Sequence, residues 1–204
     1  MNKKYDDVDK KAILLKTVVK VVADGGLENA SVRIIADAAG FPGVFIYRYF
    51  EDKDFLISSA YKLENEKLMK LLIKAIEEEN QYIDTHPLKQ RSAYVISTAW
   101  KYLTENVDVC KFLVYYYNSP SFAKFSMEEH SAWVDKLCEA LYPTFGSKED
   151  EKAMLYMVFN SVYAFAMQVA NGQIPNTKET EEVVFRNIYT AILACYEKLH
   201  SSGI

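Results

Sequence analysis

Residues 31–53 constrain the fold of this chain more than any other stretch, because they combine a helix start, a glycine stop and a second helix. Ser31 is an N-cap candidate, since its hydroxyl can accept a hydrogen bond from an early unpaired backbone N–H. Gly40 lies where the first helix must end, and glycine adopts the left-handed conformation without a Cβ clash. Pro42 suits the first turn of a new helix, where its missing N–H is no loss. The pattern predicts two short helices joined by a tight turn.

The second of these helices divides into an inner and an outer face. Helical spacing places Ile46 and Phe50 inward, and Tyr47, Arg48 and Tyr49 at or near the surface. Two short helices joined by a glycine turn, with hydrogen-bonding side chains on the second, are typical of a DNA-reading helix-turn-helix.

This stretch resembles the N-terminal domain of the tetracycline-repressor (TetR) family of bacterial transcriptional regulators. The residues that match the family pattern are Ser31, Arg33, Ile35, Ala36, Ala39, Gly40, Ile46, Tyr47, Tyr49, Phe50, Lys53 and Leu56. The resemblance implies an all-α protein of about nine helices. Residues 1–53 would form a three-helix helix-turn-helix DNA-binding domain, and residues 54–204 a larger helical domain for ligand binding and dimerisation. The motif covers the N-terminal part alone, and beyond it the likeness rests on length and helical pattern.

The resemblance also implies which residues contact DNA. The expected DNA-binding residues are Ser31, Arg33, Gly43, Val44, Phe45, Tyr47, Arg48, Tyr49 and Lys53. Tyr47, Tyr49 and Lys53 match family positions that touch the DNA backbone, where contacts set register and make affinity depend on salt. Ser31 and Arg33 begin the supporting helix.

Residues 42–45 depart from the family pattern. They read Pro-Gly-Val-Phe, where the family has Ser-x-Gly-Thr, so the usual serine cap and DNA-contacting threonine are missing. Val44 and Phe45 can pack on thymine methyl groups, an apolar form of base readout. Alternatively, Phe45 turns inward and props the helix against the core. Arg48 is the candidate for a hydrogen bond to guanine, although it could equally hold a phosphate.

Length and composition favour a cytoplasmic helical protein. The chain has 204 residues, of which 50% are apolar, with only 7 glycines and 5 prolines. No segment is expected to reach about 18 apolar residues without a charged one, so no membrane span is expected. The first residues lack the apolar core of a secretory signal. Cys110, Cys138 and Cys195 are odd in number and widely spaced, which favours free, buried thiols in a reducing compartment.

The charge is distributed unevenly along the chain. The net charge is −4, yet residues 10–50 contain six basic and three acidic side chains, a net charge of +3. A basic N-terminal part on an acidic body can orient on DNA without indiscriminate binding. Ordinary solvated lysines would give the same count, so this balance does not decide the function by itself.

Helical periodicity predicts a long helix after the helix-turn-helix of residues 31–53 and two apolar helices at the end of the chain. Asp52 is an N-cap candidate for a helix that continues to about Glu79, long enough to connect two domains. The last two helices, expected over residues 147–172 and 176–200, carry more apolar positions than one packing stripe needs. In the family these helices form a four-helix homodimer interface; the alternative is that both are central core helices.

The body of the chain is rich in aromatic side chains, which suit a pocket for a largely apolar molecule. The residues expected to bind the ligand are Trp100, Phe112, Tyr116, Trp133, Phe159 and Tyr163. Because few buried charges are apparent there, a neutral or weakly polar effector is expected. Aromatic residues at helical spacing are also ordinary core residues.

No catalytic or cofactor-binding pattern stands out. His86, His130 and His200 have no partner at metal-ligand spacing, and glycine patterns for a nucleophile elbow or a phosphate loop are absent from the sequence. The sequence therefore predicts no enzyme, metal or cofactor. It predicts a ligand-responsive transcriptional repressor that binds a palindromic double-stranded DNA operator as a homodimer and is released by a small-molecule effector. The alternatives are a helical small-molecule-binding protein without a specific operator, and an enzyme on the same scaffold.

Overall fold

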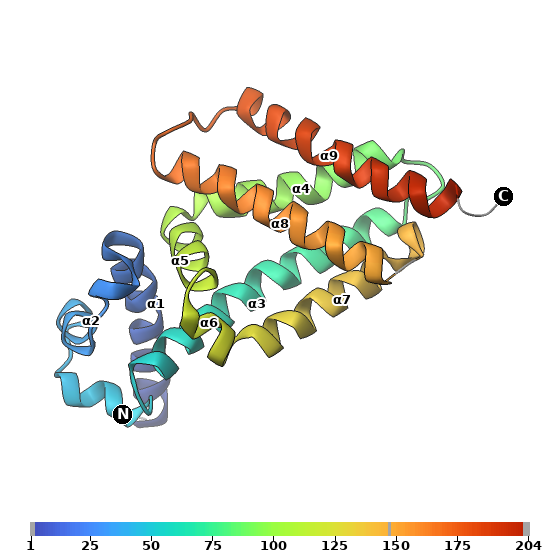
Figure 1. Ribbon diagram of the computed structural model, residues 1–204. Coiled ribbons are helices and arrows are strands. Elements are labelled where there is room, and N and C mark those ends of the chain that lie inside the picture. The colour runs from blue at the N-terminus through green and yellow to red at the C-terminus, as the bar shows by residue number, and fades with distance from the viewer. Residues whose placement is uncertain (1–2, 147, 202–204) are drawn as a thin grey trace. The chain divides into compact units, whose positions relative to one another are not determined.

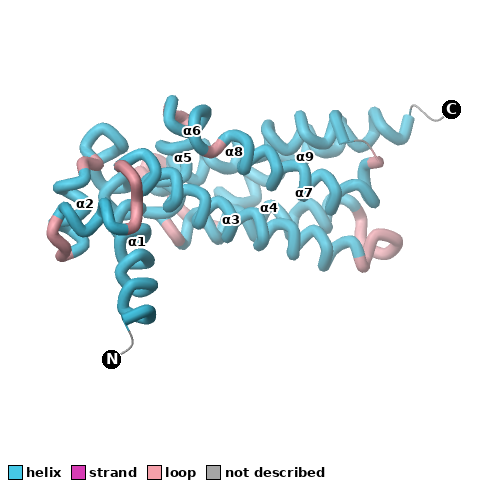
Figure 2. Tube along the Cα trace, turned by 90° about the horizontal axis from the view of Figure 1, so that it is seen from below, coloured by secondary structure: helices cyan, strands magenta, loops and turns pink. Residues whose placement is uncertain are grey.

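The structure is a computed structural model that describes the backbone of residues 3–146 and 148–201 and the side chains of residues 9–146 and 150–201. Within those residues every regular element is helical, and Figure 2 shows helices joined by short loops. The expected all-α fold is confirmed. The elements are α1 (Lys3–Asn29), α2 (Val32–Ala39), the 3₁₀ helix η1 (Gly43–Arg48), α3 (Lys53–Asn80), α4 (Leu88–Glu105), α5 (Val107–Tyr117), α6 (Pro120–Phe125), α7 (Met127–Phe145), α8 (Lys148–Ala170) and α9 (Lys178–Ser201).

Packing divides the chain into two compact units. The first contains the residues up to Asn65 together with Asp108–Glu129, and the second contains Glu66–Val107 and the residues from His130 onward. The first unit therefore holds α1, α2, η1, the start of α3, and α5 and α6. The expected domain boundary between residues 53 and 54 stays a prediction, and the first compact unit extends along α3 to Asn65.

The core of the first unit is built on α1 and α2, which pack against each other. α1 presents Leu14, Val18 and Val22, each fully buried, and α2 contributes Ile35 and Ala36, also fully buried. The small Ala36 side chain allows close approach of the two helices. The regular part of α1 ends at Gly26, whose φ of 76° and ψ of 170° interrupt the helix.

In the second unit α4, α8 and α9 pack against one another, and Figure 1 shows them side by side. Their shared core includes Trp100, Val162, Ala166 and Ile188, none more than 4% exposed. α3 is one continuous helix from Lys53 to Asn80, so it supplies residues to both units. This agrees with the long helix expected from the sequence.

Two details concern the helices that follow α5. α6 is an additional short helix, whose N-cap Ser119 accepts a hydrogen bond from the Phe122 N–H at 3.3 Å. α7 continues through Pro143 to Phe145 and is followed by Gly146 with a φ of 76°. Cys110 and Cys138 are buried, as expected, and burial raises the pKa of the Cys110 thiol to about 12, so it is an unreactive packing residue.

The burial of His130 should make the free energy of unfolding decrease in acid. Its ring is 4% exposed, and burial lowers its pKa from 6.5 to about 4. The unfolded chain therefore takes up a proton near pH 6.5, whereas the folded chain does so only near pH 4. This contribution to the free energy of unfolding is intact above pH 6.5 and decreases by about 3 kcal/mol as the pH falls to 4.

Urea unfolding at pH 7, 5.5 and 4.5 should show a shallower pH dependence for His130→Gln than for the wild type. His200→Gln, which changes an exposed ring, is the control, and equal slopes in His130→Gln and wild type would contradict the assignment.

Candidate nucleic-acid interface

The first helix of the reading pair is fixed at both ends by local chemistry. The Ser31 hydroxyl accepts a hydrogen bond from the Ile34 N–H at 3.2 Å, as expected of an N-cap. Gly40 has a φ of 73° and a ψ of 27°, and its N–H points back to the carbonyl oxygens of Ala36 and Asp37. A residue with a Cβ would be strained in this left-handed conformation. The chain therefore leaves α2 in a defined direction toward η1.

The second helix of the pair is a 3₁₀ helix of six residues rather than an α-helix. Pro42 is its N-cap and makes no side-chain capping hydrogen bond. The Phe45 N–H donates instead to the Pro42 carbonyl at 2.8 Å, which closes a tighter i to i+3 turn. A serine in place of Pro42 would offer a hydroxyl acceptor to the first free N–H groups. The unusual residues 42–45 thus alter the helix type as well as its side chains.

Phe45 lies inside an aromatic row and is half-buried. Its ring stacks on Phe41 with centroids 5.3 Å apart and meets Tyr49 at 5.4 Å. The Lys10 ammonium and the Arg48 guanidinium lie 5.5 and 5.6 Å from the centre of the Phe45 ring. Cations over a ring face are attracted to it. These contacts favour the alternative in which Phe45 props the reading helix.

Three side chains of η1 form its outer face. Val44 is 77% exposed and Tyr47 is 58% exposed, and Arg48 is exposed beside them. Ile46 lies on the opposite face and is fully buried, which fixes this orientation. Val44 is suited to pack on a thymine methyl group and the Tyr47 phenol to contact a phosphate. The Arg48 guanidinium is suited to bind a guanine edge.

The remaining expected DNA-contacting residues surround this face to different degrees. Arg33 is highly exposed and forms a surface ion pair with Asp37, with Nε and Oδ2 3.8 Å apart. Gly43, Tyr49 and Lys53 are half-exposed. Asp52 caps α3 by accepting from the Phe55 N–H at 2.7 Å, so Lys53 begins that helix beside a fixed turn.

Sequence reasoning missed the contributions of Lys10 and Phe41. Neither belongs to the family motif, yet both contact Phe45. The spacing of Phe41, Phe45 and Tyr49 at four-residue intervals is the signal that could have revealed the aromatic row. Lys10 lies 35 positions away in sequence on α1, so its contact depends on how that helix packs.

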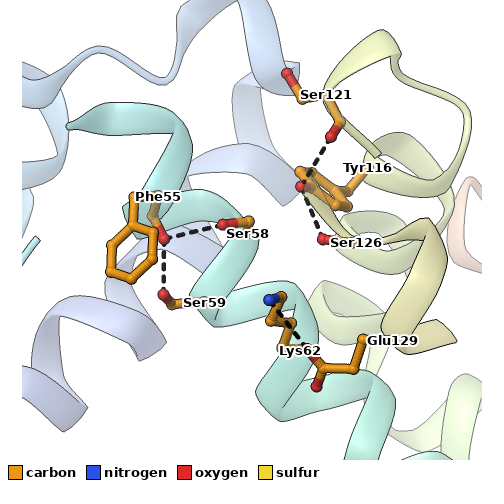
Figure 3. Close-up of polar contacts among 8 residues, drawn as sticks. All are labelled: Phe55, Ser58, Ser59, Lys62, Tyr116, Ser121, Ser126 and Glu129. Atoms are coloured by element: carbon orange, nitrogen blue, oxygen red, sulfur yellow. Dashed lines mark hydrogen bonds and ion pairs between the residues drawn. The ribbon is translucent and has the colours of Figure 1, made fainter. Parts of the chain in front are cut away.

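The start of α3 is joined to α5–α7 by a buried polar and aromatic cluster (Figure 3). The Tyr116 ring packs on Tyr61 with centroids 4.7 Å apart. Its hydroxyl lies 3.1 Å from Ser126 Oγ and donates to the Ser121 carbonyl at 3.4 Å. Lys62 Nζ lies 3.0 Å from Glu129 Oε2 in the same region. Burial raises the pKa of the Tyr116 phenol, so the phenol stays neutral in the core.

Residues 14–60 match the family of bacterial regulatory proteins called the tetR family. This segment is therefore similar in sequence to the corresponding part of tetR-family regulators. The matched residues include the caps, the glycine turn and η1, so the family match and the observed geometry fall on the same segment. The helix-turn-helix is therefore a DNA-binding domain.

Solved structures with the same fold cover almost the whole chain. A transcription regulator from Marinobacter aquaeolei VT8 is 19% identical, with a TM-score of 0.72, and 92% of this chain and 97% of that chain are covered. The regulator FadR from Bacillus subtilis, in complex with stearoyl-CoA, is 22% identical with a TM-score of 0.66, covering 87% and 96%. The multidrug binding protein EbrR, complexed with imidazole, is 16% identical with a TM-score of 0.63, covering 89% and 94%. At these identities the likeness shows the fold. No curated protein sequence matches the chain.

The aromatic residues expected to bind an effector are distributed between the two units of the chain. Phe112 and Tyr116 are fully buried in the first unit. Trp100, Trp133, Phe159 and Tyr163 belong to the second unit, where Trp100 is 2% exposed and Trp133 carries the Lys136 ammonium 4.1 Å above its ring. As an effector site this set stays a prediction. None of the six lines a cavity of about 80 Å³ that lies within the second unit.

Proposed function

We propose that the protein is a transcriptional repressor that binds a near-palindromic operator as a homodimer and is released by a small-molecule effector. The observation that carries the proposal is the outer face of η1, where Val44, Tyr47 and Arg48 stand exposed on a helix-turn-helix whose inner side is buried. Two such helix-turn-helix domains, called heads below, would be related by a two-fold axis and bind two half-sites in successive major grooves. A DNA-binding regulator of this kind acts in the cytoplasm.

Apolar surface on α8 and α9 supports a homodimer through these two helices. An 18-residue window within Asp150–Ala170 has a mean hydropathy of 1.4, and 28% of that window is buried. By length and composition alone this helix could cross a bilayer, which differs from the sequence expectation that no segment could. α8 leaves a helical stripe exposed, formed by Ala153, Met157, Asn160 and Ala164. α9 exposes a stripe with the same residue spacing, formed by Val183, Asn187, Thr190 and Ala194. Small and apolar side chains on two adjacent helices allow a partner helix to approach closely, so these stripes suit a four-helix interface better than a membrane.

An effector would act by favouring one of two head arrangements. α3 is the structural reason for this part of the proposal, because the same helix contributes to both packing units. A ligand that binds one arrangement more tightly shifts the population toward it, and operator affinity changes by that difference in ligand affinity. In a repressor the ligand-bound arrangement has the weaker operator affinity.

Selection of bound sequences from a random double-stranded DNA library tests the operator. We expect an enriched near-palindrome with A·T pairs under Val44. If Arg48 pairs with guanine, Arg48→Ala should lose about 1–3 kcal/mol of base discrimination at one position in each half-site. Arg186→Ala, an exposed arginine on α9, is the matched control. A library without an enriched palindrome would remove the operator and leave a helical small-molecule-binding protein, and identical preferences for wild type and Arg48→Ala would show that Arg48 does not read bases.

Lys53 is expected to hold a DNA phosphate. It is half-exposed at the start of α3, next to the turn that follows η1. Removing one phosphate contact should weaken binding to every sequence and reduce the slope of log affinity against log salt by about one. Fluorescence anisotropy titrations of Lys53→Ala across salt concentrations measure this slope. Lys67→Ala, an exposed lysine later on α3, is the control, and an unchanged slope in Lys53→Ala would refute the assignment.

A further inference from the structure

The second unit contains a small apolar cavity with a buried arginine in its wall. The cavity has a volume of about 80 Å³ and is lined by residues of α3, α4, α7, α8 and α9. Its walls include Ile76, Phe145, Met154 and Ile192, all buried. Leu88, on the other hand, is a lining residue that is half-exposed, so the cavity approaches the surface there.

Arg91 is the residue that distinguishes this cavity from an ordinary packing defect. It is 8% exposed, and its Nη1 donates a hydrogen bond to Thr144 Oγ1 at 2.8 Å. Its Nε is buried and has no hydrogen-bond partner among the residues that the structure describes. Arginine remains charged at all relevant pH values, and burying a charge that is incompletely paired costs several kcal/mol. The guanidinium therefore lacks an anion.

The acidic residue in the cavity wall does not supply this anion. Glu79 lines the same cavity, but its Oε2 lies 3.3 Å from Nδ1 of His86. Arg91 takes part in none of the ion pairs found between described side chains. Asn80, another lining residue, uses its amide to donate to the Ala140 carbonyl at 2.8 Å. The unsatisfied donor thus points to a ligand from outside the chain.

We infer that this cavity binds a straight-chain monocarboxylate, with the carboxylate on Arg91 and the hydrocarbon chain against the apolar wall. A guanidinium and a carboxylate form paired, charge-assisted hydrogen bonds with matching planar geometry. Pockets for drug-sized ligands are several times larger than this one, so a short or medium chain fits better than a bulky ring system. This proposal differs from the neutral or weakly polar effector expected from the sequence, because Arg91 places a buried charge in the second unit. It rests on the proposed function in one respect, which is that the bound carboxylate is the effector.

Isothermal titration calorimetry of the full-length protein without DNA tests the site. The probes are butyrate, hexanoate, octanoate and decanoate, with methyl octanoate and octan-1-ol as uncharged counterparts of octanoate. We expect at least one carboxylate to bind, and octanoate to bind more tightly than its methyl ester. Arg91→Gln should weaken carboxylate binding by about 30-fold, as expected for a lost charge-assisted hydrogen bond. Lys89→Gln removes an exposed charge two residues away and should leave the affinity unchanged.

Several results would overturn the assignment. They are the absence of binding by every carboxylate, equal affinity for octanoate and its methyl ester, or unchanged affinity in Arg91→Gln. The comparison of octanoate with its ester uses the wild type alone, so it decides the question even if Arg91→Gln does not fold. Operator affinity is measured separately with the carboxylate that binds. Binding that leaves operator affinity unchanged would keep the site and refute the proposed regulation by this ligand.

Discussion

Met157→Glu combined with Ala164→Glu should split the dimer and abolish tight operator binding. Both residues are exposed on the same stripe of α8, and Met157 is 41% exposed. In a two-fold interface each substitution appears twice, so four like charges meet where apolar groups should pack. Such juxtaposition costs several kcal/mol, which corresponds to at least a 100-fold weaker dimer at about 1.4 kcal/mol per factor of ten. Sedimentation velocity and operator anisotropy measure the two effects.

The choice of these positions depends on the burial seen in the structure. Ile188 is apolar and on α9, but it is 4% exposed within its own unit, so a charge there would unfold the protomer. Phe159 is half-buried and has the same disadvantage to a lesser degree. Met127→Glu is the matched control, because Met127 is 48% exposed and lies on α7. A folded double variant that stays dimeric would refute the interface, as would a wild type that is monomeric at micromolar concentration.

Tyr116→Ala should lower the free energy of unfolding by about 3–5 kcal/mol, the range for removing a large buried aromatic side chain. The Tyr116 ring is fully buried between Tyr61 and Phe122, with centroids 4.7 and 6.3 Å away. Tyr116→Phe keeps the ring and loses only the hydroxyl near Ser126, so it should cost about 1 kcal/mol. Urea unfolding followed by circular dichroism gives both values.

The same pair of variants separates a core role for Tyr116 from the effector contact expected from the sequence. A core residue gives the stability losses above, and Tyr142→Ala, which removes a ring that is 53% exposed, should change stability by less than about 0.5 kcal/mol. The core role would be wrong if Tyr116→Ala kept wild-type stability. In that case a changed affinity for an effector would favour the ligand role.

Local features of the DNA-binding head were predictable because they depend on neighbours in sequence. Ser31 and Asp52 cap the helices that follow them, and Gly40 adopts the left-handed conformation that ends α2. A cap is satisfied by a backbone group three residues away, so no tertiary contact is needed to specify it. The inward direction of Ile46 follows in the same way from helical spacing.

Features that depend on the choice between local and distant partners were harder to predict. The ends of α1 are one example, because this helix begins at Lys3 and is interrupted by a kink at Gly26. The short helix α6 is another, because Ser119 caps it and Pro120 is its first residue. Phe45 was left with two possible directions, since its outcome depends on Lys10 from another helix as well as on its neighbours.

The sequence by itself determined the helical class, the helix-turn-helix and the resemblance of residues 14–60 to tetR-family regulators. All three depend on residues within one or two helical turns of each other. Only the tertiary structure decided what the body of the chain offers a ligand. Arg91 and Thr144 are 53 positions apart and meet through a hydrogen bond of 2.8 Å. In the sequence Arg91 is one of two charged residues at the start of a helix. Whether such a charge faces water or an apolar cavity depends on which helices cover it, and helical periodicity carries no information about that packing.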